Sequence, residues 1–340
     1  MSESLLCDEV WLSCPETPGC CDHHHHHEPN KWSSLERGAG SDNEEYHDAN
    51  IIVMCLEKEP SYMPGPEYVD YLQSNNNLMQ SRSRAIQWLF KSRSRLNLSF
   101  GTVFNAANYL DRFISMNQCQ GWRYWMIELT SVACLSVASK FTETSAPSLH
   151  EIQMEDLEYS FQSNSTKRME LTLLQALGWR LSSITTYSYV ELLISNLNSL
   201  DSRVLNELTT RATKLLLGSI LDFKLLEYRP SAVAVSAIWC TLDELIPSSH
   251  AHLASITRLF NQDQKDDVVK CHTIMKSRRV NPLCNLIVCG QPCYWPSSPV
   301  TVLLRERIDI YDCQVDLSIF KNVPAGSNIN LESCTKRRKK

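Results

Sequence analysis

The stretch WRYWMIELTSVACLSVASKF, residues 122–141, is apolar on almost every side when it is wound as a helix. A helix without a polar face lies inside a bundle, because each of its sides needs apolar neighbours. The stretch therefore predicts the central, enclosed helix of an all-α module.

Amphipathic helices are predicted on both sides of this central stretch. Upstream, apolar residues recur at the i, i+3, i+4 and i+7 spacing of a helix, and Ser99 stands where its N-cap belongs. Downstream, the last helix of the module stops at Gly178. The five predicted helices cover residues 81–94, 100–114, 122–141, 155–161 and 166–177.

A second set of five helices follows a short hinge at 181–185. Asp201 stands at the N-cap of one helix and Pro230 in the first turn of another, which are favourable positions for these residue types. The predicted helices of this second module cover residues 187–196, 201–221, 230–245, 252–260 and 263–276.

These patterns divide the chain into four parts and predict an all-α fold of two tandem five-helix modules between disordered tails. The expected parts are an acidic disordered head (1–48), a first module with a preceding helix (49–182), a second module (183–280) and an irregular, proline-containing tail with a terminal basic cluster (281–340).

Composition excludes several classes of protein. Only 10 of the 340 residues are glycine, which disfavours glycine-rich nucleotide-binding architectures. No run approaches the 18 apolar residues of a membrane span, and residues 1–10 lack the basic start of a secretory signal. We therefore expect an intracellular, soluble protein without a membrane partner.

Charge is distributed unevenly along the chain. Residues 1–80 contain fifteen acids and three bases, a net charge of −12, whereas the rest carries +7, five of them in Lys336–Lys340. The acidic head cannot offset its ordering entropy by burial. Since the helical modules are nearly neutral, we expect no direct contact with nucleic acid.

Neither a metal, another cofactor nor an enzyme activity is expected. Most of the 14 cysteines lie in apolar patterns, where cysteine behaves as a small hydrophobe. Phosphate-binding loops, nucleophile elbows and kinase motifs are absent from the sequence. Two groups lack the paired spacing of zinc sites: Cys14, Cys20 and Cys21 with His23–His27, and Cys284, Cys289 and Cys293.

Four strings resemble the signature segments of the cyclins, and within them those of the D-type cyclins of plants. They are LDRFIS (110–115), VASKF (137–141), KRMELTLLQALGWRLSSITTYSY (167–189) and RPSAVAVSAIW (229–239). The resemblance implies two tandem cyclin boxes, with a cyclin-dependent kinase and inhibitor proteins of that kinase as partners.

Lys140 and Glu170 match the family's lysine and glutamate that hydrogen-bond the regulatory helix of the kinase. A groove with charged margins suits the docking of a helix, which is the preferred interpretation. The alternative is that both residues are ordinary solvated or intramolecularly paired charges. The apolar positions that match those burying the kinase helix are Val137, Phe141, Leu174, Trp179 and Leu181.

The resemblance fails at a second groove, which in many cyclins binds Arg-x-Leu substrate peptides. Counted from Trp88, its arginine is present as Arg82, but Arg84 and Lys91 replace an apolar and an acidic residue. The gain in positive charge argues against basic peptides here. We expect structural roles in the first box for Arg82, which should pair with an acid of its own module, and for Trp88 and Asp111.

Near the start, Leu5, Cys7 and Glu9 form an LxCxE motif. D-type cyclins carry this motif near the same end and use it to bind retinoblastoma-type pocket proteins. The alternative is a chance match in a disordered head.

At the other end, the cluster Lys336, Arg337, Arg338, Lys339 and Lys340 predicts a nuclear import signal, with the protein in the nucleus and also in the cytoplasm. The alternatives are a solvated tail and a loose contact with nucleic acid.

The preferred hypothesis is a regulatory subunit that activates a cyclin-dependent kinase, recruits retinoblastoma-related pocket protein and promotes the G1/S transition. Two alternatives remain: a cyclin-box transcription adaptor, and an inactive cyclin that sequesters pocket protein.

Overall fold

The computed structural model of the chain describes residues 41–117, 121–154, 157–197, 200–246, 250–279 and 307–320. The LxCxE residues, the basic cluster Lys336–Lys340 and both cysteine groups lie outside these ranges. Within them, no helix combines the length and apolar character that a bilayer span requires.

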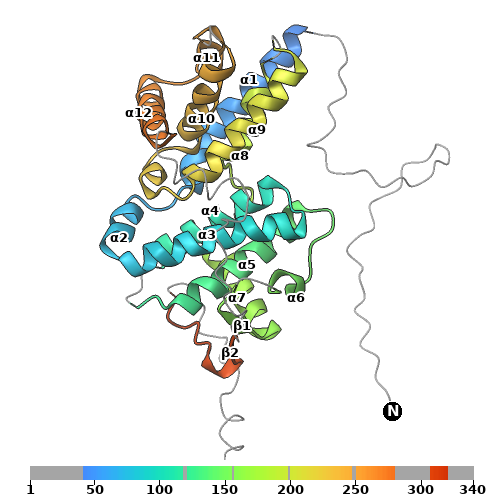
Figure 1. Cartoon of the computed structure of the whole chain (residues 1–340), viewed down its shortest axis with the longest axis vertical. Coiled ribbons are helices and arrows are strands. Elements are labelled where there is room, and N and C mark those ends of the chain that lie inside the picture. The colour runs from blue at the N-terminus through green and yellow to red at the C-terminus, as the bar shows by residue number, and fades with distance from the viewer. Residues whose placement is uncertain are drawn as a thin grey trace, which may run out of the picture. The chain divides into compact units, whose positions relative to one another are not determined.

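The first box is built around one enclosed helix, as predicted. Every residue of α5 from Met126 to Ser139 is buried, and α5 packs against α3, α4 and α7. Ser99 caps α4, since its Oγ accepts the Thr102 N–H at 3.2 Å. The helices of this box are α3 (Asn76–Leu96), α4 (Phe100–Met116), α5 (Tyr124–Thr142), α6 (Leu149–Ile152) and α7 (Ser163–Ala176) (Figure 1).

The second box has the same design around α10, whose residues 231–238 and 240–242 are buried. Pro230 begins α10, as expected, but the Asp201 side chain makes no capping hydrogen bond at the start of α9. The helices of this box are α8 (Thr186–Ser195), α9 (Ser202–Ser219), the 3₁₀ helix η2 (Phe223–Glu227), α10 (Pro230–Leu245), α11 (His250–Ile256) and α12 (Gln262–Arg279).

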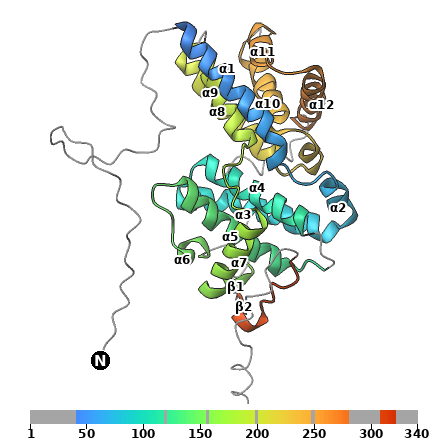
Figure 2. The same ribbon diagram turned by 180° about the vertical axis from the view of Figure 1, so that it is seen from behind.

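Helix α1 (Ser41–Lys58) precedes the first box in sequence but packs on the second. Its Ile52 and Leu56 join the apolar cluster of α8 and α10, and both views show α1 beside α9 (Figures 1 and 2). The helix begins at Ser41, so it extends into residues 41–48, which the sequence assigned to the head. The 3₁₀ helix η1 (Glu59–Tyr62) and α2 (Tyr68–Ser74) lead on to α3.

A buried ion pair fixes α3 to α4. The Arg82 guanidinium donates to both carboxylate oxygens of Asp111, at 2.6 and 2.8 Å, and Tyr68 donates to the same carboxylate at 2.7 Å. Arg82 also donates to the Ile220 carbonyl at the end of α9, at 3.0 Å. Because both charges are buried, removing either partner alone would leave an uncompensated charge, at a cost of about 3–5 kcal/mol.

The described part of the chain has two short strands, one where the sequence predicted a helix and one where it predicted an irregular tail. Residues 155–161 were expected to be helical, but Tyr159–Phe161 forms the strand β1. The Glu128 carboxylate accepts the N–H groups of Glu158 and Tyr159, so these amides need no helical carbonyls. Strand β1 pairs in parallel with β2 (Ile308–Ile310), with Tyr159 opposite Ile308.

The segment 307–320, which we call the C-terminal clasp, therefore differs from the irregular tail expected over 281–340. Val315, Leu317 and Phe320 are buried in the core of the first box. The ring of Phe320 lies 5.1 Å from that of Phe113 and 5.3 Å from that of Trp122. Burying Val315, Leu317 and Phe320 away from water stabilises the clasp. This burial accounts for an ordered segment in a stretch that the sequence predicted to be irregular.

The clasp also makes polar contacts with the elements around β1. Its Arg307 donates to the carbonyls of Gln153 and Met154 just after α6, and its Asp312 accepts from Asn164 and Ser165 in the first turn of α7. The clasp thus joins the end of α6 to the start of α7.

Candidate functional site

An ion pair links the end of α5 to the middle of α7. The Lys140 Nζ lies 2.8 Å from each carboxylate oxygen of Glu170. The Lys140 side chain is 52% exposed and that of Glu170 only 12%. Because half of the Lys140 side chain is exposed, water screens its attraction to Glu170, and the ammonium group is accessible to a partner.

Two large aromatic side chains that follow these charges in the sequence are exposed. Phe141 follows Lys140 directly and is 49% exposed, and Trp179, just after α7, is 64% exposed. Leu174 and Leu181 are partly buried against the core of the first box. A single exposed apolar side chain is ordinary on a protein surface, but aromatic side chains are the typical anchors of protein interfaces.

Val137 does not belong to this exposed set. It is 5% exposed and lies in the core of the first box. Val137 stands one helical turn before Phe141, where α5 is still enclosed, so it supports the surface from beneath rather than lining it.

Leu171 is a residue that the sequence analysis missed. It is 48% exposed, and it precedes Leu174 by three residues, so both lie on neighbouring positions of one side of α7. The three-residue spacing of Leu171 and Leu174 is the sequence feature that could have identified Leu171. We call the resulting set the docking surface: Lys140, Phe141, Glu170, Leu171, Leu174, Trp179 and Leu181.

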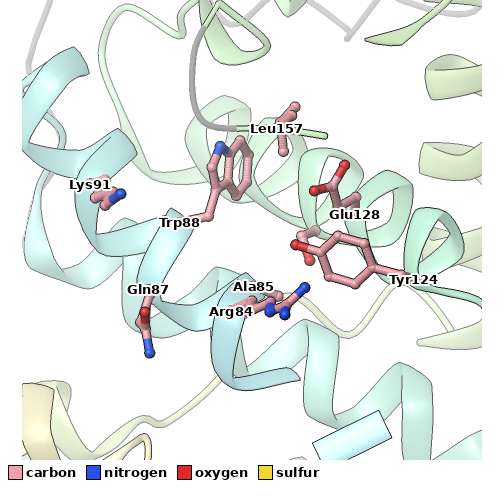
Figure 3. Close-up of a pocket in the computed structure, with 9 residues that line it drawn as sticks. Arg84, Ala85, Gln87, Trp88, Lys91, Tyr124, Glu128 and Leu157 are labelled. Carbon is pink, nitrogen blue, oxygen red and sulfur yellow. The ribbon is translucent and has the colours of Figure 1, made fainter. Parts of the chain in front are cut away.

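A cavity of about 170 Å³ lies between α3 and α5, and its lining includes Arg84, Trp88 and Lys91, which the sequence assigned to the second groove. Figure 3 shows Arg84 near the Tyr124 ring, and the guanidinium carbon lies 5.1 Å from the ring centre and the group 3.7 Å from Glu158. Lys91 also lines the cavity. A basic peptide would meet both of these cations.

The lining of this cavity exposes little apolar surface. Trp88 is 5% exposed, and Ala85 offers little apolar area. Burial raises the pKa of Glu128, whose carboxylate is already occupied by two backbone N–H groups. The residues present therefore lack the large exposed apolar anchors that the docking surface has.

No cluster of histidine, cysteine, aspartate and glutamate in the described ranges has the arrangement of a metal site. The buried thiols of Cys134 and Cys271 have pKa values raised by burial, which makes them poor ligands and poor nucleophiles.

Comparison with known proteins gives consistent matches across both boxes. The family description "Cyclin, N-terminal domain" matches residues 50–182, and "Cyclin, C-terminal domain" matches residues 184–284. Cyclin-D1-1 of Arabidopsis thaliana is 30% identical over 67% of this chain and 68% of its own length. Cyclin-D4-1 of the same plant is 32% identical over 67% of this chain and 74% of its own length.

Among solved structures, a viral cyclin from herpesvirus saimiri matches 58% of this chain and 85% of its own, with 12% identity and a TM-score of 0.49.

Proposed function

The chain belongs to the cyclin family, and on that premise we propose that its docking surface binds the regulatory helix of a cyclin-dependent kinase. Cyclins are regulatory subunits of kinases rather than enzymes, and the relatives of this chain are D-type cyclins of plants. The observation that carries the proposal is the exposure of Phe141 and Trp179 close in sequence to the Lys140–Glu170 pair and its neighbours.

The geometry suits a helix laid into a groove. Exposed apolar side chains supply affinity by leaving water, and the paired charges set the register of the bound helix. Glu170 is held by Lys140 at 2.8 Å, so both charges are oriented before the partner arrives, which reduces the entropy lost on binding.

Activation follows from differential binding. If the docking surface fits the kinase helix only in its inward position, binding shifts the kinase toward that state. The inward helix completes the lysine–glutamate pair that holds the ATP phosphates. The cyclin contributes no reacting group.

The test is a binding assay with a cyclin-dependent kinase that co-purifies with the chain. The double variant Lys140→Ala with Glu170→Ala should lose complex formation. The matched control is Lys270→Ala with Asp267→Ala, which removes another exposed ion pair, with 3.2 Å between its charged atoms, from α12 in the second box. Equal binding by both double variants would show that the docking surface is assigned wrongly.

We also propose that Leu5, Cys7 and Glu9 recruit a retinoblastoma-related pocket protein, and so couple the kinase to the G1/S transition. A tether raises the local concentration of the substrate at the bound kinase. The support for this step is the LxCxE motif in an acidic head. Inhibitor proteins of the kinase are further partners that we propose for the complex.

Recruitment is tested by comparing two substrates. Cys7→Ala with Glu9→Ala should reduce phosphorylation of pocket protein more than that of histone. The control Cys14→Ala with Glu16→Ala changes the same residue types in the same head, outside the motif. Equal losses on both substrates would remove the tether. Pocket-protein binding without kinase activation would instead identify an inactive, sequestering cyclin, and a gel shift with promoter DNA would identify a transcription adaptor.

For localisation, we propose that Lys336–Lys340 directs import into the nucleus, with a cytoplasmic pool. Alanine at all five positions should move a fluorescent fusion to the cytoplasm, and an unchanged distribution would contradict the signal.

A further inference from the structure

Trp179 has an unusual backbone for a large side chain. Its φ is +60°, directly after Gly178 with φ +59°. Glycine adopts this left-handed region freely, but a tryptophan there is strained and persists only where its surroundings fix it. The same Trp179 is 64% exposed, so packing of its own ring does not account for the conformation.

The turn that contains Trp179 closes the end of α7. The Gly178 N–H donates to the Gln175 carbonyl and the Trp179 N–H to the Leu174 carbonyl, both at 3.0 Å. These bonds satisfy carbonyls that the end of a helix leaves open. They fix the turn from its N-terminal side.

Two side chains of α4 fix the turn from its C-terminal side. The Tyr109 hydroxyl donates to the Leu181 carbonyl at 2.6 Å, and the Arg112 guanidinium donates to the Arg180 carbonyl at 3.0 Å. Tyr109 and Arg112 are three residues apart and so lie on one side of α4. They hold the two consecutive carbonyls that follow Trp179.

The buried guanidinium of Arg112 lowers the stability of the fold, because its desolvation is only partly compensated. It is fully buried, and among the described residues its Nε and Nη2 have no hydrogen-bond partner. Its other contacts are the Ser183 hydroxyl at 3.4 Å and the Tyr62 ring at 5.2 Å. A buried cation without a carboxylate weakens a fold, so stability alone does not explain an arginine here.

We propose that Tyr109 and Arg112 are positioning residues for kinase binding: they hold the carbonyls after Trp179 so that its strained turn presents the indole on the docking surface. This inference rests on the proposed function, because it assigns Trp179 to the kinase interface. Neither Tyr109 nor Arg112 touches the partner, since both are fully buried.

The first test is a double-mutant cycle of kinase affinity in the full chain. Trp179→Ala should weaken binding by about 10- to 100-fold, as loss of an aromatic anchor does. Tyr109→Phe should weaken it by about 3- to 10-fold, the range for one lost hydrogen bond. Because Tyr109 acts through the turn, the double variant should bind no more weakly than Trp179→Ala alone.

Tyr68→Phe is the matched control. It also removes a buried tyrosine hydroxyl from the first box, but that hydroxyl donates to Asp111 at 2.7 Å rather than to the turn. Tyr68→Phe should lower the unfolding midpoint at least as much as Tyr109→Phe and leave kinase affinity unchanged. Equal losses of affinity in both variants, or additive losses in the cycle, would overturn the positioning role.

Arg112→Met gives a second test, in which the unfolding midpoint should not fall as it does in Tyr109→Phe. Removing an unpaired buried cation should hold or raise the unfolding midpoint, while kinase affinity falls by about 3- to 10-fold, again without additivity to Trp179→Ala. Unchanged affinity would contradict the role of Arg112. If Trp179→Ala itself binds normally, the docking surface fails instead, which separates the two proposals.

Discussion

The Glu59 carboxylate caps the first turn of a helix that begins 171 residues later in the sequence, at Pro230. Its Oε1 accepts the Ser231 N–H at 2.7 Å, and its Oε2 accepts the Ser231 hydroxyl at 3.0 Å. Glu59 is fully buried, so the residue just after α1 is anchored to the start of α10. A carboxylate also complements the positive end of the helix dipole.

The burial of Glu59 predicts a pH-dependent stability. Burial raises the pKa of Glu59 above its ordinary value of 4.5, although hydrogen bonds from Ser231 and Tyr189 and the charge of Arg229 act in the opposite direction. The folded state therefore binds this proton more tightly than the unfolded state does. The stability from protonated Glu59 is complete below pH 4.5 and is lost as the pH rises through the raised pKa.

Glu59→Gln isolates this effect, because the amide does not titrate. Urea unfolding of both chains between pH 4 and 8, about the range over which carboxylates with raised pKa values titrate, should show wild type losing stability relative to the variant as the pH rises. A constant difference, or one of the opposite sign, would contradict the raised pKa.

Reversing the Lys140–Glu170 pair separates its role in the fold from its role in binding. Lys140→Glu with Glu170→Lys keeps an ion pair between α5 and α7, so unfolding free energy should change by less than about 1 kcal/mol. A partner helix would meet inverted charges, and affinity for the kinase should fall by about 10- to 100-fold. Calorimetric titration measures this, and undiminished affinity of the reversed chain would argue against charge recognition.

Phe141→Ser should weaken kinase binding more than it weakens the fold. The side chain is 49% exposed, so the free energy of unfolding should fall by about 1–2 kcal/mol, less than for a fully buried phenylalanine. Loss of an apolar anchor should cost about tenfold or more in affinity. Val269→Ser is the control, because Val269 is 52% exposed on α12 of the second box. The prediction fails if the two variants bind alike.

Phe320→Ala should destabilise the first box, because Phe320 is 4% exposed and its ring packs on Phe113 and Trp122. The expected loss is about 3–5 kcal/mol of unfolding free energy, the usual range for a buried phenylalanine. Ile319→Ala, at a neighbouring position that is 43% exposed, should cost less than about 1 kcal/mol. Similar small losses for both would show that the clasp does not belong to the core.

The sequence predicted those parts of the fold that depend on local pattern. The enclosed run of α5, the Ser99 cap and the start of α10 at Pro230 all follow from residue spacing. The parts that it missed depend on distant partners. Strand β1 has three residues, too few for an alternating pattern, and its partner β2 lies 149 residues further along the chain.

The sequence identified most residues of the candidate site, but it did not show which of them are buried and which are exposed. Resemblance and spacing indicated Lys140, Glu170 and their neighbours, but they could not show that Val137 is enclosed while Leu171 is exposed. Nor could they show where Tyr109 and Arg112 point. Both are polar groups on a buried helix, and their hydrogen bonds end on backbone carbonyls, which leave no trace in the sequence.

The parallel pairing of β1 with β2 sets an order of events on the ribosome. The residues of β1 are made first, and at ordinary synthesis rates the roughly 150 residues that separate Tyr159 from Ile308 take about 7 to 30 s to translate. During that interval the first box lacks the strand that pairs with β1 and the Phe320 ring that packs on Phe113 and Trp122. Final packing of the first box thus waits for a segment that is made after the whole of the second box.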